Sequence, residues 1–134
     1  MAQVTGPVVI DAGVLIGLLD PADAHHTWSV QLLRSLGPGR MIVNAITLAE
    51  ALVHPAIAGV APVALTTITR LGPRIVSVSE SDVLDLAQLR AASGLRMPDA
   101  LVVHTAAREA AAVATTDQRL AREVSAVGLV AHQP

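Results

Sequence analysis

Apolar residues recur along the chain in two alternating patterns. Short runs in which nearly every residue is apolar are typical of strands buried on both faces of a parallel sheet. Between them, apolar residues repeat every three or four positions, which indicates helices. The short runs occupy residues 8–10, 41–43, 74–78 and 112–115, with a candidate fifth strand at 129–130. This alternation predicts an α/β fold in which helices cover both faces of a parallel sheet.

Capping and breaking residues set the bounds of the predicted helices. Asp23 is a candidate N-cap for a helix that Gly37-Pro38-Gly39 ends. His54-Pro55 ends another helix, and the spacing of Ser79 and Asp82 approximates a capping box. The predicted helices span residues 14–19, 24–36, 45–53, 60–71, 80–92, 98–109 and 117–127.

The composition fits one compact domain over residues 1–134. A chain of 134 residues buries roughly two thirds of the surface of its unfolded form. With 52% hydrophobic and 15% charged residues, the core must consist of Ala, Val, Leu and Ile. No run reaches the roughly 18 apolar residues of a membrane span, and the start lacks a signal-like pattern, so we expect a cytoplasmic protein. The absence of cysteine excludes disulfides and thiolate metal sites.

The charged and aromatic residues argue against a basic or base-stacking surface. The net charge is −2, and the nine basic residues, all arginine, form no basic stretch. Phe and Tyr are absent, so only Trp28 could stack on a base, and we expect it in the core. A nucleic-acid partner would therefore need metal ions to meet its phosphates.

Two acidic residues follow strands and a third begins a helix. Asp11 directly follows the first strand and Asp117 lies two residues beyond the fourth, and the carboxyl ends of parallel strands form the ligand crevice of open sheets. Asp99 starts the helical row of Val102 and Val103, so we expect its carboxylate to be partly desolvated. Each also has a structural explanation: Asp is a favoured N-cap, and an acid in a first turn gains about 0.3–1 kcal/mol from the helix dipole.

Glu50 is a fourth acid that neither capping nor the helix dipole explains. It lies in mid-helix among apolar residues that include Ile46 and Val53. We therefore expect Glu50 to face the same site, and an exposed glutamate of good helix propensity is the alternative.

Convergence of these four carboxylates would decide the chemistry of the site. Two unit charges about 5 Å apart repel by roughly 3 kcal/mol at an effective dielectric near 20, so the group must hold protons or cations. Oxygen ligands suit Mg²⁺ and Mn²⁺, and one or two such ions support phosphodiester cleavage. Thr115 or Thr116 would orient a ligand or the attacking water.

Four short segments surround these acids in order along the chain. They are Val9-Ile10-Asp11 with Val14-Leu15-Ile16, then Ile46-Thr47-Leu48-Ala49-Glu50, Arg96 to Val102, and Thr115 to Leu120. In order, separation and chain length they resemble the motifs of PIN-domain ribonucleases, and within them the VapC-type toxins of toxin–antitoxin pairs. The resemblance implies a three-layer α/β/α domain with a five-stranded parallel sheet. It also implies that the first and fourth strands are adjacent, with Asp11 beside Asp117.

The resemblance further implies a metal-dependent endoribonuclease that acts as a toxin. Its expected cofactor is one or two Mg²⁺ or Mn²⁺ ions, and its expected partners are RNA, a second copy in a homodimer and a small antitoxin. The antitoxin helix would lie in a groove formed with the second helix and the 60–71 helix. The ligands it implies are Asp11, Glu50, Asp99 and Asp117, supported by Thr115 and Thr116.

Three further positions bear on this expectation. The family often has Ser or Thr two residues after the first Asp, where this chain has Gly13. Thr115 matches the family's usual hydroxyl position near the fourth acid and would supply more of the hydroxyl contacts that Gly13 cannot make. Arg96 and Arg119 lie beside the motifs and are candidates for contacts with substrate phosphates.

Other functions stay open at this point. One is a catalytically impaired PIN-fold module that binds RNA or protein, which Gly13 favours. Another is a Mg²⁺-dependent phospho-acceptor α/β domain, but such domains use a lysine and the chain has none. Serine hydrolases and P-loop proteins lack support because their motifs are absent. Adjacent helical residues do not face each other, so we expect no metal site at His25-His26. We expect all five histidines, including His54, His104 and His132, on solvated surface.

Overall fold

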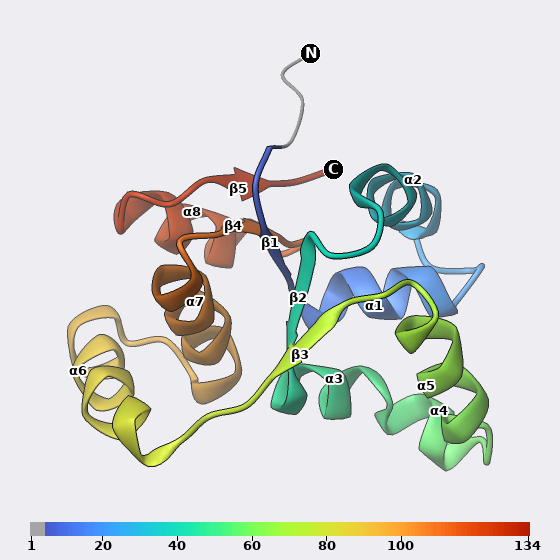
Figure 1. The fold of residues 1–134 in the computed structure, drawn as a ribbon, viewed down its shortest axis with the longest axis horizontal. Helices are drawn as coiled ribbons and strands as arrows, with labels where there is room; N and C mark the ends of the chain where they lie inside the picture. The colour runs from blue at the N-terminus through green and yellow to red at the C-terminus, as the bar shows by residue number, and fades with distance from the viewer. Residues whose placement is uncertain (1–4) are drawn as a thin grey trace.

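The computed structural model describes residues 5–134, which form a five-stranded parallel sheet between two layers of helices (Figure 1). The strand order is β3-β2-β1-β4-β5. The central strand β1 pairs with β2 on one side and with β4 on the other. The predicted α/β/α architecture and the adjacency of the first and fourth strands are therefore confirmed. The strands are β1 (Val8–Ile10), β2 (Met41–Asn44), β3 (Arg74–Val76), β4 (Ala112–Ala114) and β5 (Ala131–His132).

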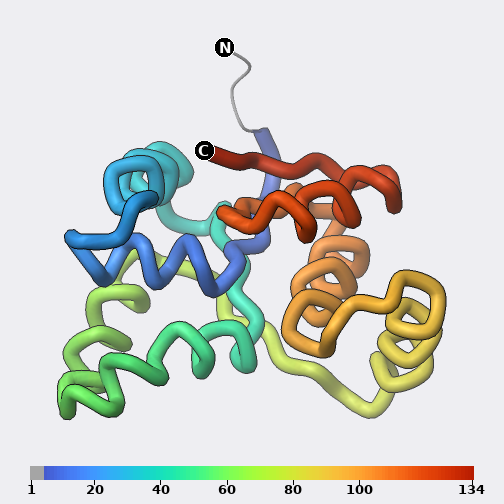
Figure 2. Tube along the Cα trace, turned by 180° about the vertical axis from the view of Figure 1, so that it is seen from behind, coloured from blue at the N-terminus to red at the C-terminus, as the bar shows by residue number. Residues whose placement is uncertain are grey.

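The helices fall into two groups on opposite faces of the sheet (Figure 2). The first comprises α1 (Ala12–Leu19), α2 (His26–Leu36), α3 (Ala45–Ala51), α4 (Val53–Ile57) and α5 (Ala61–Thr69). The second comprises the 3₁₀ helix η1 (Glu80–Asp82), α6 (Val83–Ser93), α7 (Met97–Glu109) and α8 (Gln118–Ala126). Within residues 5–134, no helix is long and apolar enough to cross a membrane.

The pleat of the sheet divides the core into two apolar clusters. Val8 and Ile10 of β1 point into the cluster that contains Leu15 and Leu33, whereas Val9 points into the cluster that contains Leu101. Side chains alternate between the two faces of a strand, so a strand covered on both faces must be apolar at every position. This requirement accounts for the short apolar runs that the sequence shows.

Some element boundaries differ from the prediction. β3 ends at Val76, and β5 lies at residues 131–132 because Leu129 still bonds back to the α8 carbonyl of Val124. The predicted helix over 45–53 breaks at Leu52, and His54-Pro55 lies in the first turn of α4 instead of ending a helix. A proline is tolerated there because first-turn N–H groups have no intrahelical partner.

The predicted side-chain cap is present at the start of η1 but absent at the start of α2. Ser79 and Asp82 form the predicted capping box. Asp23 does not cap α2: its side chain accepts the His25 N–H at 2.8 Å, and α2 begins at His26 without a side-chain cap.

Two histidines expected on solvated surface are held by hydrogen bonds. His26 Nδ1 lies 2.7 Å from the Gly17 carbonyl oxygen. His104 is buried, and its Nε2 lies 2.9 Å from Asp82 Oδ1. Arg108 donates to the second Asp82 oxygen at 3.0 Å. The bonds of His104 and Arg108 to Asp82 fasten η1 and the start of α6 to α7.

The Asp82 carboxylate is strongly stabilised in its ionised form. The Ser79 N–H, which donates at 2.8 Å, is the largest influence, and His104 and Arg108 add to it. Together they hold the pKa of Asp82 well below its usual range. The attachment of η1 to α7 through Asp82 is therefore electrostatic.

The contact between α1 and α2 depends on one glycine. A Cβ added at Gly17 would lie 2.5 Å from Ser29 Oγ, so only glycine leaves room for that hydroxyl. Ser29 is fully buried, and its Oγ has no hydrogen-bond partner among residues 5–134. The helices thus approach closely at the expense of one unsatisfied polar atom.

Removing the buried hydroxyl should stabilise the protein. We expect Ser29→Ala to raise the free energy of unfolding by about 1 kcal/mol, because an unsatisfied buried hydroxyl costs this much or more. We expect Gly17→Ala to lower it by about 1–3 kcal/mol through overpacking. In the double variant, Gly17→Ala should cost clearly less, as measured by urea unfolding of all four proteins. Equal costs of Gly17→Ala in both backgrounds would contradict the steric explanation.

Candidate active site

Asp11 and Asp117 stand at the carboxyl ends of two neighbouring strands. Asp11 directly follows β1, and its N–H donates to the Ala114 carbonyl of β4 at 3.0 Å. The chain order reverses at β1, since β2 and β4 lie on opposite sides of it. Open parallel sheets bind ligands at such a reversal.

Both oxygens of the Asp11 carboxylate have defined partners. Oδ1 accepts the N–H of Ala12 at 2.8 Å, which caps α1. Oδ2 accepts the Thr115 hydroxyl at 2.7 Å. The oxygen of that fully buried hydroxyl also accepts the N–H of Asp117 at 3.0 Å. Thr115 therefore holds the ends of β1 and β4 together, and helix capping by Asp11 fixes its carboxylate in place.

Asp117 is exposed and caps α8 with one oxygen. Its Oδ1 accepts the N–H groups of Arg119 at 2.8 Å and Leu120 at 3.2 Å. Oδ2 takes part in no such bond within residues 5–134. Capping and ligand binding are thus compatible at this residue.

Asp99 lies in the first turn of α7, half-buried as its row with Val102 and Val103 predicted. Burial is the main influence that raises the pKa of Asp99, and the charge of Asp117 raises it further. The nearby charges of Arg96 and Arg119 act in the opposite direction.

Asp11 is subject to the same kind of repulsion. Burial raises its pKa most, the hydrogen bonds from Thr115 and Ala12 oppose this, and the charges of Asp99 and Asp117 raise it again. Asp11, Asp99 and Asp117 are therefore a group of mutually repelling carboxylates, which we call the acidic group.

Glu50 does not belong to this group in the structure. It lies on α3, half-exposed, and is not among the charges that shift the pKa of Asp11 or Asp99. Its apolar neighbours Ile46 and Val53 are 49% and 51% exposed, so the inference that they mark a buried face was wrong. Its helix α3 packs against both α1 and α7.

The donor set fits a hard divalent cation in its chemistry. All candidate ligands are oxygens, and the repulsion among the three carboxylates would be relieved by a cation. As the side chains are placed, residues 5–134 contain no group of three or more His, Asp or Glu side chains gathered closely enough to ligate one ion.

Gly13 has a role that the sequence pattern did not indicate. A Cβ at this position would lie 2.5 Å from Thr116 Oγ1. The position where the sequence lacks a hydroxyl thus makes room for a hydroxyl from another segment. Gly13 and Thr116 lie far apart in the sequence and come together only because the fold brings α1 to the loop after β4.

An apolar pocket of about 280 Å³ lies apart from the acidic group. Its lining residues belong to α1, α3 and α4 and to the residues that follow α1 and α4, and include Ile16, Ala51 and Pro55. The groove expected from the second helix and the 60–71 helix is not this pocket, although a second pocket follows the surface of α5.

The family model of the PIN domain matches residues 8–124. No curated protein matches the chain. The fold is similar to that of VapC20 from Mycobacterium tuberculosis, described as a toxin that cleaves the sarcin–ricin loop, with a TM-score of 0.78, 16% identity and coverage of 95% of this chain and 99% of that one. It is also similar to FitAcB from Neisseria gonorrhoeae, with a TM-score of 0.73, 22% identity and coverage of 92% and 95%.

A third similar fold is that of a DNA-bound VapBC from Salmonella typhimurium, with a TM-score of 0.69, 15% identity and coverage of 96% and 98%. At these identities the likeness shows the shared fold.

Neutralising Asp11 should stabilise the metal-free protein. Because its folded pKa is raised, ionised Asp11 costs folding free energy above that pKa, and protonation removes the cost as the pH falls. We expect Asp11→Asn to melt a few degrees above the parent at pH 7 in EDTA, with the difference shrinking towards pH 4.

Asp85→Asn is the matched control, since Asp85 is exposed in the first turn of α6. It should not raise the melting temperature, because it removes a favourable interaction with the helix dipole. A melting temperature of Asp11→Asn below that of the parent at pH 7 would contradict the repulsion.

Proposed function

The chain belongs to the PIN-domain family, and on this premise we propose that it is a metal-dependent endoribonuclease, the toxin of a toxin–antitoxin pair. The observation that carries the proposal is the acidic group at the carboxyl end of the sheet. Burial and mutual repulsion raise the pKa values of two of its members. Carboxylates held in this way favour binding of a divalent cation.

Each residue has a distinct part in the proposed reaction. Asp11, Asp99 and Asp117, joined by Glu50, would hold one or two Mg²⁺ or Mn²⁺ ions. When bound, such an ion supplies Lewis-acid chemistry that activates water and stabilises the leaving oxygen. Thr115 fixes the Asp11 carboxylate through its 2.7 Å hydrogen bond and thereby keeps one ligand preorganised.

Arg96 and Arg119 are the proposed phosphate contacts. Both are exposed, and both lie close enough to Asp99 to lower its pKa. A phosphodiester that enters the acidic group would meet these guanidinium groups at its edge, where they can donate paired hydrogen bonds to phosphate oxygens. The exposed arginines would thus reduce the repulsion between the acidic group and the phosphates of RNA.

The proposed partners follow from the family and its solved members. The similar structures include one described as a toxin–antitoxin complex from Klebsiella pneumoniae, so we propose a small antitoxin as partner of this chain. A homodimer and action on cytoplasmic RNA belong to the same proposal. Repulsion in the acidic group also makes it receptive to a cationic antitoxin side chain such as arginine.

One observation favours a second candidate, a PIN-fold module that binds RNA or protein without cleaving it. Glu50 lies outside the acidic group, and no three acidic or histidine side chains among residues 5–134 are gathered as ligands. The raised pKa values favour the nuclease, because a binding module has no need of buried, repelling carboxylates.

The central prediction is metal-dependent RNA cleavage. We expect the purified chain to cleave total RNA with Mn²⁺ and to leave it intact in EDTA. Asp11→Asn and Asp99→Asn should each lower the rate by at least roughly 100-fold, the upper range for loss of an outer-shell partner. Sequencing of the new RNA ends would define the cut site.

Asp85→Asn is again the control and should cleave like the parent. Glu50→Gln should also slow cleavage if the side chain turns inward to join the ligands. Intact RNA under both metals, without any rise in melting temperature on adding Mn²⁺, would refute the nuclease and favour the binding module.

Removal of the two arginines should weaken RNA binding. We expect Arg96→Ala and Arg119→Ala, each placed in the non-cleaving Asp99→Asn background, to reduce affinity by several-fold. The slope of log affinity against log salt should fall by about 0.7 per lost phosphate contact on single-stranded RNA. The Asp99→Asn background removes the effect that each arginine has on the Asp99 pKa.

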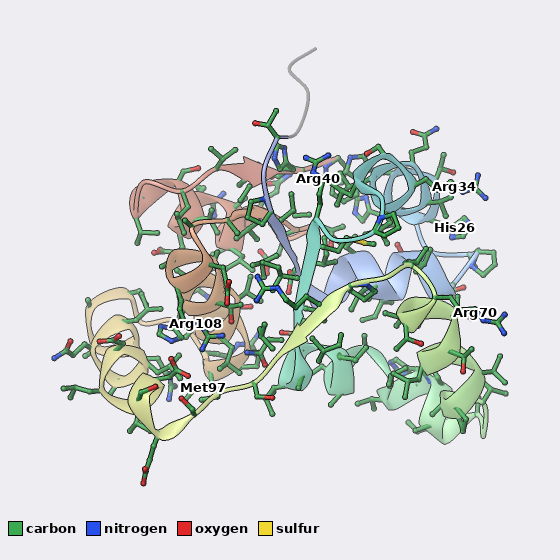
Figure 3. The ribbon with its side chains drawn as sticks, viewed as in Figure 1. His26, Arg34, Arg40, Arg70, Met97 and Arg108 are labelled. Carbon is green, nitrogen blue, oxygen red and sulfur yellow. The ribbon has the colours of Figure 1, made fainter. Side chains whose placement is uncertain are left out.

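Arg70→Ala is the matched control. Arg70 lies at the end of α5, far across the molecule from Met97 at the start of α7 (Figure 3). Its removal should leave the salt slope unchanged. Equal slopes for all three arginine variants would contradict the assignment.

A further inference from the structure

Asn44 is a buried polar residue at the carboxyl end of β2 that the proposed reaction does not use. It is 1% exposed and pairs with Val76 of β3 as the last residue of its strand. The register pairs Val9 of β1 with Ile42, so two further residues along each strand bring Asn44 level with Asp11. Side chains alternate between the faces of a sheet, and Asn44 therefore points to the same face as Ile42, the face that α7 covers. Asn44 and Asp11 thus end neighbouring strands.

The side-chain amide of Asn44 connects the two layers of helices. Its Oδ1 accepts the N–H of Ile46 at 2.9 Å and so caps α3. Its Nδ2 donates to the hydroxyl of Thr105 on α7 at 3.3 Å. That hydroxyl in turn donates to the Leu101 carbonyl at 2.7 Å. Helices α3 and α7 belong to different layers, and α3 begins where β2 ends (Figure 1), so one amide holds both helices to the same point of the sheet.

The direction of each bond in this chain is fixed. The Ile46 N–H can only donate and the Leu101 carbonyl can only accept. The Thr105 hydroxyl, which is buried, therefore gives its proton to Leu101 and accepts from the Asn44 amide. Hydrogen bonds depend on direction as well as distance, whereas burial of apolar surface is non-directional. The apolar contacts of α7 thus hold it against the sheet, and the bond from Asn44 sets where along the sheet it lies.

The position of α7 matters because this helix carries Asp99. Thr105 lies six residues after Asp99, which is roughly 9 Å along a helix axis, so a shift at Thr105 moves Asp99 with it. Asp11 and Asp117 repel Asp99. This repulsion pushes the start of α7 away from the strand ends, and the bond between Asn44 and Thr105 opposes that displacement.

We propose that Asn44 is a positioning residue of the acidic site: it fixes α7, which carries Asp99, and α3, which carries Glu50, at the carboxyl edge of the sheet. It does for the two layers of helices what Thr115 does for strands β1 and β4. A paired amide adds little net stability, since two apolar groups of the same shape serve about as well. Its contribution is a defined geometry. This inference rests on the proposed function, because Asn44 acts through the carboxylates.

The test measures Mn²⁺ binding to the complete chain without RNA, from the electron paramagnetic resonance signal of free Mn²⁺, together with the melting temperature in EDTA. We expect Thr105→Val to lower the melting temperature, because the buried Asn44 amide loses its acceptor, and to raise the Mn²⁺ dissociation constant several-fold. Asn44→Ser keeps a capping hydroxyl for α3 but is too short to reach Thr105. It should weaken Mn²⁺ binding to the same extent.

The double variant separates positioning from stability. In Asn44→Ser/Thr105→Val no amide is left unpaired, so the melting temperature in EDTA should equal that of Asn44→Ser alone. The Mn²⁺ dissociation constant should stay several-fold above that of the parent, because α7 is still not held in place. Parent-like Mn²⁺ binding in the double variant would show a merely structural pair and overturn the inference.

Two single variants are the controls. Thr105→Ser keeps the hydroxyl and should bind Mn²⁺ like the parent. Thr66→Val on α5 removes a hydroxyl that donates to the carbonyl four residues earlier, as the Thr105 hydroxyl does, and should leave Mn²⁺ binding unchanged. A loss of Mn²⁺ binding in Thr66→Val as large as in Thr105→Val would also count against the role of Asn44.

The outcomes distinguish this inference from the proposed function. A parent that binds Mn²⁺ while Thr105→Val and Asn44→Ser bind it equally well overturns the role of Asn44 and leaves the nuclease intact. A parent that binds no Mn²⁺ overturns both.

Discussion

The hydrogen bond from Thr115 to Asp11 is the interaction on which the site depends. It joins the ends of β1 and β4 at 2.7 Å, and the same buried hydroxyl accepts the N–H of Asp117. One oxygen atom thus joins the Asp11 carboxylate to the backbone of Asp117, two residues more than one hundred positions apart in the chain. A buried hydroxyl that both donates and accepts a hydrogen bond is held rigidly, and it restrains the groups to which it is bonded.

Around this bond, the fold combines stable elements with an unfavourable charge arrangement. Strand β1 is buried on both faces, and capping by Asp11 and Asp117 begins the helices α1 and α8. The same carboxylates repel Asp99, whose helix α7 is fastened at its other end through Arg108 and His104 to Asp82. The apolar layers therefore hold the three acids together against their repulsion.

The sequence predicts what local patterns determine. Apolar runs located the sheet, and the row of Val102 and Val103 correctly indicated a half-buried Asp99. Prediction failed where tertiary contacts decide. Ile46 and Val53 are apolar but exposed, so the apolar residues around Glu50 do not mark a buried face. The buried pairing of His104 with Asp82 joins residues 22 positions apart, and no periodicity marks it.

Glycine positions 13 and 17 lie one helical turn apart on α1, and an oxygen from another segment fills the space beside each. These two glycines let α1 pack closely against both the loop after β4 and helix α2. The consequence for divergence is epistasis: an alanine at either position costs less stability once residue 116 or residue 29 has lost its hydroxyl. A survey of single substitutions would therefore overstate the need for glycine at both positions.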